Sequence, residues 1–394
     1  MPRPIPLIAA CLAPLMLNFA AAGAAFADMK SFSVKGTQGT ELTAKPLAAF
    51  DSAWAMTFLP DGRALVSEKS GAIWLLNKDG SKAGKISGGP TVTPRGQGGM
   101  GDIIVHPDFA QNGTVFLSYV ERDAKKSRLS GAVVERAKLT LGASTGKLAK
   151  RDRVWEQRPK VTGNGHYGHR LVIGPEGHLF ISSGERQKFT PSQNMSMNLG
   201  KSIRLNQDGS APKDNPFYIG DGSAADEIWT LGHRNPLGIA FDPKGRLWMQ
   251  EMGPRHGDEL NLIERSKNYG YPHVSNGDHY SGKKIPDHAD IPIYEAPKAS
   301  WVPAISPGGL MFYTGKAFSD WKGDAFIGGL SSMALIRVEI TEPKEGSRRG
   351  VTAAEAERYE WERRIREVEQ GPDGAIYVLE DQEDGRLIRL TAKK

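Results

Sequence analysis

Cysteine is almost absent from this chain of 394 residues, because Cys11 is the only one and it lies in the N-terminal segment. A disulfide framework and a cysteine-ligated metal site are therefore both excluded. Beyond the first residues, no stretch approaches the roughly 20 apolar residues that span a bilayer, so we predict no membrane span. Lys and Arg number 51 against 45 Asp and Glu, and the basic residues are scattered. This distribution lacks the basic patch that binds nucleic acid, and we expect no nucleic-acid partner.

The N-terminal segment has the pattern of an export signal. Arg3 precedes an apolar run from Ile5 to Phe19, and small residues end at Ala25-Phe26-Ala27. The A-x-A site predicts cleavage after Ala27 and a periplasmic or secreted protein. A membrane anchor is the alternative interpretation of the apolar run. We therefore predict a signal peptide at residues 1–27 and a single domain at residues 28–394.

Glycine and proline are plentiful, at 46 and 25 residues, which favours many short strands joined by tight turns. A short apolar run, a glycine-containing turn and a second strand-like run recur along the chain. The turns are marked by Pro60, Pro107, Pro175, Pro243, Asp320 and Pro372. Each unit of roughly 60 residues is long enough for four strands. We predict an all-β fold, a six-bladed β-propeller with four-stranded antiparallel blades.

Two segments depart from this repeat. Residues 352–367 are rich in Ala, Glu and Arg, and their helix propensity predicts a short helix or an exposed loop before a strand that starts near Arg364. The longest connection, from Glu259 to Pro307, is dense in Gly, Pro, Asn and His. Loops of that length on a rigid scaffold usually cover or build a site.

Polar residues lie just upstream of four of the turns. The innermost strands of a propeller line one central channel, so equivalent positions from different blades converge there. A histidine among cationic and amide groups suits a general base beside an anionic ligand. Taken singly, each of these residues could instead cap a strand or satisfy a loop carbonyl. The set consists of Gln97, His166, Arg234, Asn235, Arg364 and Arg366.

Five motifs give this chain a resemblance to a known family. It resembles the soluble aldose or glucose dehydrogenases that use pyrroloquinoline quinone (PQQ), over nearly the whole length from Trp54 to Leu390. The motifs are GQGGMGDIIVHPDF, HYGHRLVIGPEG, GHRNPLGIAFDPKG, EMGPRHGDELNL (followed by NYGYP) and RRIREVEQGPDG. The resemblance implies oxidation of the anomeric carbon of an aldose to a lactone.

The resemblance also implies roles for residues near the reacting atoms. His166 is expected to be the catalytic base that takes the proton of the anomeric hydroxyl, while the hydride leaves C1 for the quinone. Arg234 and Asn235 are expected to contact the quinone oxygens, and Arg234 to stabilise the negative charge that the hydride brings. Gln97 is expected near both the sugar and the cofactor.

Further roles concern cofactor and metal. Arg364 and Arg366 match arginines that bind cofactor carboxylates, a contact that guanidinium groups make well. Gly253 and Pro254 match positions whose backbone carbonyls hold Ca²⁺, an ion that prefers oxygen ligands and would polarise the quinone. The electron acceptor is expected to be a cytochrome or a quinone, replaced by a dye in vitro.

Two positions depart from the glucose dehydrogenase branch. That branch has a carboxylate before the catalytic histidine, where this chain has Gly165. It also has a lysine that pairs with a cofactor carboxylate, where this chain has Ser331. One cofactor carboxylate is then expected to rest on hydroxyls, water or a cation elsewhere in the chain. Both changes resemble the aldose dehydrogenase branch, which accepts a broad range of sugars.

Some residues have a second interpretation. Trp301 is a candidate for stacking on the flat quinone or for simple packing, and Asp258 and Glu259 are candidates for a second calcium site or for solvated turn carboxylates. We expect His233 to be structural. His169 lies three residues after His166 on an expected strand, so the two rings should point to opposite sides of it.

Two other functions fit a six-bladed propeller. One is a calcium-dependent lactonase or esterase, whose channel-mouth metal is held by side-chain carboxylates and Asn. The other is a binding module without chemistry. The predicted arginines argue against the hydrolase, and His166 beside them argues against the binding module. Quinone-dependent oxidation of an aldose, measured beside lactone hydrolysis, distinguishes these functions.

Overall fold

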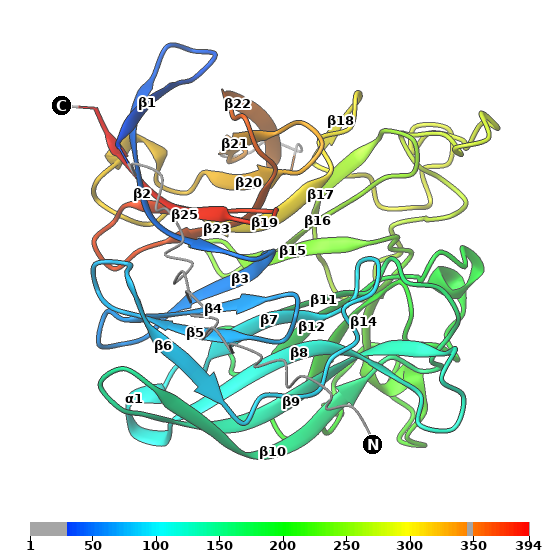
Figure 1. Ribbon diagram of the computed structural model, residues 1–394. Coiled ribbons are helices and arrows are strands. Elements are labelled where there is room, and N and C mark those ends of the chain that lie inside the picture. Colours follow the sequence, from blue (N-terminus) through cyan, green and yellow to red (C-terminus); the bar gives the residue numbers. More distant parts are fainter. Residues whose placement is uncertain (1–29, 345–349, 394) are drawn as a thin grey trace, which may run out of the picture.

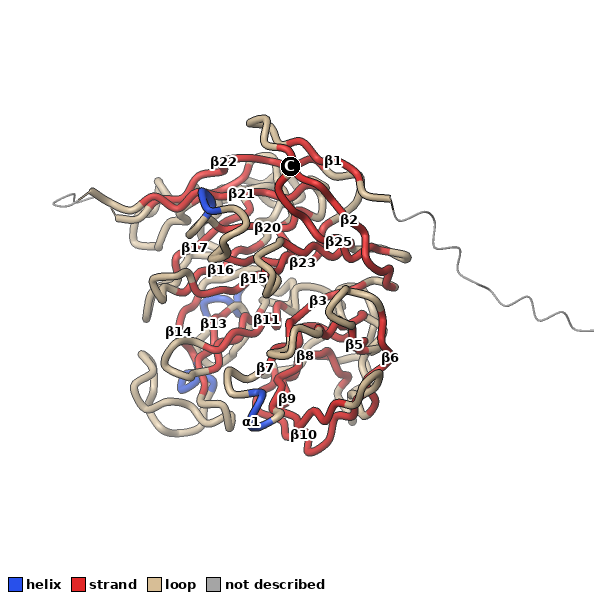
Figure 2. Tube along the Cα trace, turned by 90° about the vertical axis from the view of Figure 1, so that its left-hand side faces the viewer, coloured by secondary structure: helices blue, strands red, loops and turns tan. Residues whose placement is uncertain are grey.

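The structure, a computed structural model, describes residues 30–344 and 350–393. The signal peptide predicted for residues 1–27 lies outside the described residues. Strands dominate the described chain (Figure 2), and the helices are short. The all-β prediction is therefore confirmed. The helices are α1 (Phe109–Asn112) and the 3-10 helices η1 (Thr190–Gln193), η2 (Ala224–Glu227) and η3 (Ser319–Trp321).

The strands form antiparallel groups of four. Two of these groups are joined by a short parallel contact between their last strands, and one group carries an additional edge strand. The first strands are β3 (Ala53–Phe58), β7 (Met100–Val105), β11 (Gly168–Ile173), β15 (Pro236–Phe241), β19 (Pro307–Phe312) and β23 (Ile365–Gln370). The second strands are β4 (Ala64–Glu68), β8 (Thr114–Arg122), β12 (Leu179–Ser183), β16 (Leu247–Glu251), β20 (Ala325–Gly329) and β24 (Ile376–Glu380).

The outer strands complete each group. The third strands are β5 (Ile73–Leu76), β9 (Ser130–Leu141), β13 (Lys201–Leu205), β17 (Asp258–Leu262), β21 (Ala334–Thr341) and β25 (Gly385–Ala392). The fourth strands are β6 (Lys82–Ser87), β10 (Gly146–Glu156), β14 (Ile228–Leu231), β18 (Ala299–Trp301), β22 (Thr352–Glu360) and, for the last group, β2 (Glu41–Phe50). The additional edge strand is β1 (Phe32–Lys35), which pairs with β2.

The groups are arranged in a closed ring. Each first strand contacts the first strand of the next group, and β23 contacts β3, which closes the circle. The N-terminal strand β2 pairs with the C-terminal strand β25 (blue beside red in Figure 1), so both ends of the described chain lie in one sheet. This arrangement is that of a β-propeller.

Each predicted strand–turn–strand unit joins the first two strands of one group. In the first unit, the Leu59 N–H donates to the Arg63 carbonyl at 2.8 Å across the turn. Gly62 adopts a φ of 86°, a left-handed conformation that glycine reaches without steric cost. The glycine in these turns is therefore a conformational requirement, and this is why the motif marks the hairpins so reliably.

The prediction of a short helix or exposed loop before Arg364 is wrong. Residues Thr352–Glu360 form β22, which pairs along its length with β21. Its Glu357 is buried and accepts hydrogen bonds from the Thr40 N–H and the Tyr359 hydroxyl. Pairing with the open edge of β21 and this buried contact outweigh the helix propensity of the Ala- and Glu-rich segment.

The apolar core lies between neighbouring groups rather than inside any one of them. One cluster joins Leu65 of β4 to Leu117 of β8, and another joins Phe180 of β12 to Met249 of β16. Burying a side chain of this size contributes about 1.5–3 kcal/mol. Apolar packing between the faces of neighbouring sheets therefore stabilises the ring of strand groups. The residues along the axis of the ring are free to be polar.

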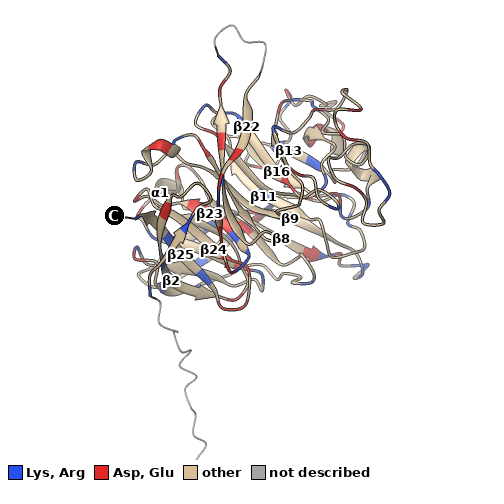
Figure 3. Ribbon diagram, turned by 90° about the horizontal axis from the view of Figure 1, so that it is seen from above, with Lys and Arg blue, Asp and Glu red and all other residues tan. Residues whose placement is uncertain are grey.

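Charges of both signs are interspersed over the molecule (Figure 3). Within residues 30–344 and 350–393, no helix combines the length and hydropathy needed to cross a bilayer.

Candidate functional site

A cavity of about 210 Å³ lies where the first strands begin. Every group contributes to its wall, so it lies on the axis of the ring. Three predicted residues, Gln97, Arg364 and Arg366, line it. Its other lining residues are Ser52, Trp54, Lys69, Gly96, Tyr167, Gly168, His169, Leu237, Met252, Leu330 and Asp381.

The two predicted arginines meet on one carboxylate. Arg364 Nη2 and Arg366 Nη2 each donate to Asp381 Oδ2 at 2.8 Å. Burial would raise the pKa of Asp381, but the two guanidiniums outweigh it and hold the pKa below its usual range. Arg366 Nε is buried and has no hydrogen-bond partner. This side of the cavity therefore keeps a net positive charge and an unused donor.

Lys69 adds a third cation to the cavity wall. It follows β4 directly and forms no ion pair with any residue in the described ranges. Sequence reasoning missed both Lys69 and Asp381, which sit one residue beyond the end of a second strand. Ser331, in contrast, is exposed and bonds to the Ala304 carbonyl at 3.3 Å, and it does not line the cavity.

His166 lies on a turn before β11 and is buried. Its Nδ1 is 2.5 Å from Glu185 Oε1, and its backbone N–H donates to Gln97 Oε1 at 2.7 Å. Because Glu185 is an acceptor, Nδ1 carries the proton and Nε2 keeps a free lone pair. Burial lowers the pKa of His166, and Arg234 and Arg186 lower it further, against Glu185, which raises it. The ring is therefore a neutral acceptor near pH 7.

Glu185 was not found from the sequence. It follows the short Ser183-Gly184 end of β12, and only the antiparallel register with β11 brings it to His166. Its Oε2 accepts the Phe189 N–H at 2.6 Å and the Lys188 N–H, and its own N–H donates to the Arg234 carbonyl at 2.9 Å. Glu185 therefore ties the imidazole to Arg234 and to the loop that follows.

The alternation used to separate the two histidines is wrong. Strand β11 begins only at Gly168, and His166 and His169 have φ values of 51° and 64°, so no extended strand connects them. His169 stacks on Trp54 with ring centroids 4.9 Å apart and lines the cavity. Burial and the Arg170 charge lower the pKa of His169 to about 3, so this ring stays neutral.

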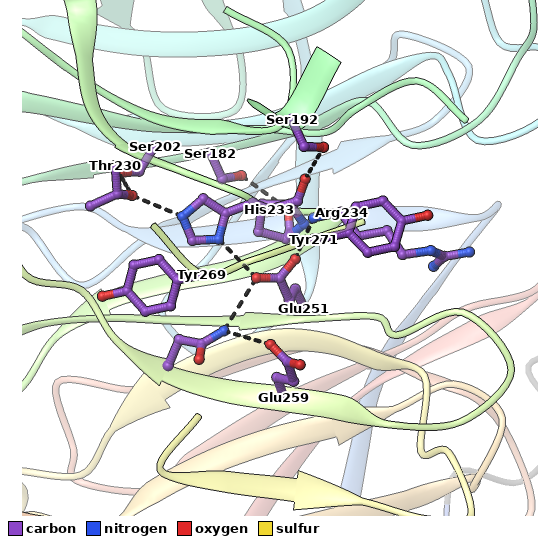
Figure 4. A network of polar contacts seen from close by, with 12 residues as sticks. Ser182, Ser192, Ser202, Thr230, His233, Arg234, Glu251, Glu259, Tyr269 and Tyr271 are labelled. Atoms are coloured by element: carbon purple, nitrogen blue, oxygen red, sulfur yellow. Dashed lines mark hydrogen bonds and ion pairs between the residues drawn. The ribbon is translucent and has the colours of Figure 1, made fainter. Parts of the chain in front are cut away.

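Arg234 and Asn235 lie on the turn that leads into β15. The Arg234 N–H donates to Glu251 Oε2 at 2.6 Å, and Glu251 Oε1 lies 2.8 Å from His233 Nδ1 (Figure 4). His233 Nε2 contacts Thr230 Oγ1 at 2.8 Å, so both ring nitrogens are used. His233 thus orients the turn, as a structural histidine does.

The side chains of this turn have unused polar atoms. Arg234 Nη1 donates to the Gly253 carbonyl at 2.6 Å and to the Met252 carbonyl at 3.1 Å. Its Nε, together with Asn235 Oδ1, is buried without a partner. Buried polar groups are normally paired, so these atoms mark a place for a polar ligand.

Gly253 and Pro254 lie between β16 and β17, and Asp258 holds their loop. Asp258 Oδ1 accepts the Gly253 N–H at 2.8 Å, and Oδ2 accepts the Ile305 and Ser306 N–H groups at 2.7 Å. Asp258 is therefore a buried carboxylate bound by backbone N–H groups and not a solvated turn carboxylate. Within the described part of the chain, no cluster of three or more His, Cys, Asp or Glu side chains could hold a metal.

Glu259, the other candidate for a second calcium, is buried rather than solvated. Asn261 Nδ2 donates both to Glu259 Oε2, at 3.1 Å, and to Glu251 Oε1, at 3.2 Å. Trp301 does not line the cavity: it lies in the outer strand β18 and donates to Glu355 at 2.7 Å. The stacking interpretation of Trp301 is therefore wrong, and packing accounts for it.

The space beside Gly165 is filled by the side chain of Gln187. A Cβ at this position would lie 2.8 Å from the Gln187 side chain, so Gln187 already occupies that space. The loop that follows Glu185 thus places an amide beside Gly165.

The fold and the site together are those of a β-propeller with a cationic axial cavity and a carboxylate-bound imidazole near it. Residues 50–389 match the family described as "Glucose / Sorbosone dehydrogenase". The chain belongs to the glucose/sorbosone dehydrogenase family, as its motifs predicted.

Relatives and solved structures agree with this assignment. The chain is 36% identical over 351 residues to "Aldose sugar dehydrogenase YliI" of Escherichia coli, covering 87% of this chain and 91% of that one. The apo-form structure of the soluble aldose sugar dehydrogenase from Escherichia coli has a TM-score of 0.81 at 34% identity, covering 89% of this chain and all of that one (100%). The PQQ-bound aldose sugar dehydrogenase of Streptomyces coelicolor has a TM-score of 0.66 at 26% identity, covering 89% and 98%.

Proposed function

We propose that this protein is a quinoprotein that oxidises the anomeric carbon of aldoses to lactones with PQQ as the hydride acceptor. The observation that carries the proposal is one axial cavity with unpaired positive charge, whose lining residue Gln97 holds the backbone of His166, an imidazole whose free nitrogen is an acceptor. The names of the two aldose sugar dehydrogenases, one of them bound to PQQ, support the same reaction.

The residues present fit this cofactor. PQQ is a flat quinone with carboxylate groups, and it needs donors at its edge and cations around it. Arg366 Nε and Arg234 Nε are buried donors without partners, and Asn235 Oδ1 is a buried acceptor without one. Arg364 and Arg366 would hold a cofactor carboxylate beside Asp381. When bound, PQQ supplies an electrophilic carbonyl carbon that accepts a hydride.

Residues of the chain transfer the proton, orient the base and stabilise the developing charge. His166 Nε2 takes the proton of the anomeric hydroxyl as the C1–H pair leaves as hydride and C1 becomes a carbonyl. Glu185 holds the ring and stabilises the imidazolium that forms. Arg234 lies near enough to His166 to influence its pKa, and its guanidinium stabilises negative charge that develops on the quinone oxygen. Gln97 positions the His166 backbone and reaches the cavity.

Lys69 is the cation that we assign to the cofactor carboxylate left unpaired by Ser331. It enters the cavity from the first group, whereas Arg364 and Arg366 enter from the last. With Asp381 as the only carboxylate among the lining residues, the wall carries a net positive charge suited to a polycarboxylate.

Calcium fits less completely. The Gly253 carbonyl, one of the two expected ligands with that of Pro254, already accepts Arg234 Nη1, and a guanidinium repels a divalent cation placed beside it. Asp258 accepts three backbone N–H groups, which leaves it few lone pairs for a metal. The proton transfer to His166 does not depend on Ca²⁺, and whether the protein needs the ion is measured in the reconstitution.

The groups of strands are proposed to be the six blades of one domain, residues 28–394, released to the periplasm or outside the cell after cleavage. Electrons would leave to a cytochrome or a quinone.

Reconstitution tests the proposed function. Purified apoprotein is expected to reduce a dye with an aldose only after PQQ is added, and Ca²⁺ is varied separately. Oxygen uptake, NAD reduction and lactone hydrolysis are measured in parallel. Lactone hydrolysis without quinone-dependent oxidation would overturn the proposal in favour of the hydrolase.

The three cations are expected to contribute mainly to cofactor affinity. Arg366→Ala should weaken PQQ binding by about 1.5–3 kcal/mol, roughly 10- to 150-fold, because its side chain is only 14% exposed. Arg364→Ala should weaken PQQ binding less than Arg366→Ala does, because the Arg364 side chain is 48% exposed. Lys69→Ala should also weaken PQQ binding. The dissociation constant is read from fluorescence quenching or calorimetry, with turnover compared at saturating PQQ.

Arg389→Ala is the matched control for these variants, because Arg389 lies in β25 of the same sheet and pairs with Asp373 away from the cavity. Affinity for PQQ that is equal in the wild type and all three cavity variants would remove these residues from the cofactor site.

A further inference from the structure

Exposed aromatic rings lie beside the imidazole–carboxylate pair. Phe189 is 44% exposed and Tyr280 is 73% exposed, which is unusual for side chains of this size. The Phe189 N–H is bound to the same Glu185 carboxylate that holds His166. The Tyr280 ring centroid lies 5.9 Å from the guanidinium carbon of Arg234. Both rings therefore border the reacting groups without being buried among them.

The backbone that presents Phe189 is strained and firmly held. Arg186, Gln187 and Phe189 have φ values of 63°, 59° and 61°, where bulky residues rarely occur. A bulky residue keeps such a conformation only where its surroundings enforce it. Here Arg186 is buried and donates to the Gly165 carbonyl at 2.9 Å and the Ser130 carbonyl at 2.6 Å. The loop is thus built to keep Phe189 outward.

The rings form one cluster around Arg234. Phe189 stacks on Tyr271 at 6.3 Å with an interplanar angle of 27°, and its centroid is 5.8 Å from that of His279. The Arg234 guanidinium is 5.9 Å from both Tyr271 and Tyr280 (Figure 4 shows Tyr271 beside Arg234). The cluster joins the loop after β12 to the long loop between β17 and β18. Its buried member, Tyr271, supports the exposed Phe189, and Arg234 lies between Tyr271 and the exposed Tyr280.

A sugar ring is the ligand that this arrangement fits. The C–H groups on one face of a pyranose pack on an aromatic ring, while its hydroxyls need polar groups at the edge. His279 contacts Phe189, and Gln187 is an exposed amide in the same loop as Phe189. Two exposed rings among polar neighbours are also far smaller than the contiguous apolar patch of several hundred Å² that marks a protein interface.

The axial cavity is too small to enclose a second sugar ring. Its volume of about 210 Å³ is below the roughly 300–1,000 Å³ of sites that enclose a drug-sized ligand. A cavity of this size has no room for the second ring of a longer sugar, so that ring lies outside it, on the side of His166 and Glu185.

We propose that Phe189 and Tyr280 form a stacking subsite for the second ring of a reducing oligosaccharide. The subsite rests on the proposed function, because it presumes that a reducing end is oxidised at His166. It makes the chain selective for disaccharides and longer aldoses through binding and not through chemistry.

The test compares glucose with maltose, which share the same reducing-end ring. In Phe189→Ala and in Tyr280→Ala, the ratio of kcat/KM for maltose to that for glucose is expected to fall about 3- to 10-fold. The fall is expected to come from a higher KM for maltose and not from a lower kcat. Phe189→Tyr should restore the ratio. Ile219→Ala removes another exposed apolar side chain, 70% exposed in a loop away from the cavity lining, and should not change it.

Binding is measured without turnover as a second readout. Methyl β-maltoside cannot be oxidised, and saturation transfer from the protein to its non-reducing ring is expected in the wild type and lost in both alanine variants. A wild type that oxidises no aldose would overturn the proposed function, while the transfer would still report on the subsite. An unchanged maltose-to-glucose ratio with unchanged transfer would overturn the subsite, as would equal losses for both sugars.

Discussion

His166→Gln is expected to lower the rate of aldose oxidation by about 10²–10⁴-fold, the usual contribution of a general base. Fold and PQQ affinity should be kept, because His166 does not line the cavity wall and glutamine can still contact Glu185. Without Nε2, no group in this turn can take the anomeric proton. Pre-steady-state reduction of the bound cofactor measures the loss directly, separate from re-oxidation by the dye.

The wild-type pH profile should report the same imidazole. Burial, with Arg234 and Arg186, lowers the pKa of His166 from its ordinary value of about 6.5. Protonation removes the acceptor, so the rate falls as the pH falls through this lowered pKa. At a pH above this pKa the imidazole is neutral, and its ionisation does not limit the rate. The acid limb should therefore lie below pH 6.5, with a single ionisation. Glu185→Gln removes the carboxylate that raises this pKa, so it should lower both the rate and the midpoint of the acid limb.

His169 provides the competing assignment, because it also lines the cavity and is neutral. His106→Gln, in the turn after β7 and away from the cavity lining, serves as a control for the loss of a histidine. If His169→Gln abolishes cofactor reduction while His166→Gln retains it, then the base is His169 and the role given to Glu185 is wrong.

The sequence predicted the hairpins well because their signal is local. A Pro-Asp-Gly turn between two apolar runs specifies its own geometry, and Gly62 shows why the glycine is needed. The strand β22 was missed because its structure is set by pairing with β21, which lies ten residues or more away along the chain, and not by its own propensity.

In the site, too, the residues marked by a local sequence pattern were found, and those placed by strand pairing were missed. Residues at the starts of first strands, such as Gln97 and Arg366, were found because the repeat places them all at one end of the ring. Glu185, Lys69 and Asp381 come after second strands, and nothing in their local sequence distinguishes them from solvated turn residues. Only the hairpin register brings each of them against a first strand. A search for charged residues just beyond each second strand would have found all three.

The same axial geometry concentrates buried charge deeper in the ring. Arg170 of β11 bonds to Glu367 of β23 and to the Leu237 carbonyl of β15 at 2.8 Å, and it lies 3.9 Å from Asp102 of β7. Its guanidinium carbon is 4.1 Å from the Trp54 ring centroid. One side chain therefore links the first strands of five groups.

Arg170→Met should destabilise the protein by about 3–5 kcal/mol, because it leaves buried carboxylates without their cation. Burial raises the pKa of Glu367 to about 7 and also raises that of Asp102, while Arg170 lowers both. Removing Arg170 raises these folded-state pKa values further. A carboxyl whose folded pKa is raised loses stability as pH rises above its unfolded value, so the deficit should grow from pH 5 to pH 8. Urea unfolding at both pH values measures it.

Charge, rather than lost packing, is the expected cause of this deficit, and a second variant separates the two. Adding Glu367→Gln to Arg170→Met should recover part of the stability, most of it at pH 8, because one buried charge is then gone. Arg136→Met removes an exposed arginine whose pairing with Asp152 is at 3.4 Å, and it should change stability by less than about 1 kcal/mol. A deficit that is equal at pH 5 and pH 8 and is not relieved by Glu367→Gln would mean that Arg170 supports the axis by packing on Trp54 and not by neutralising the carboxylates around it.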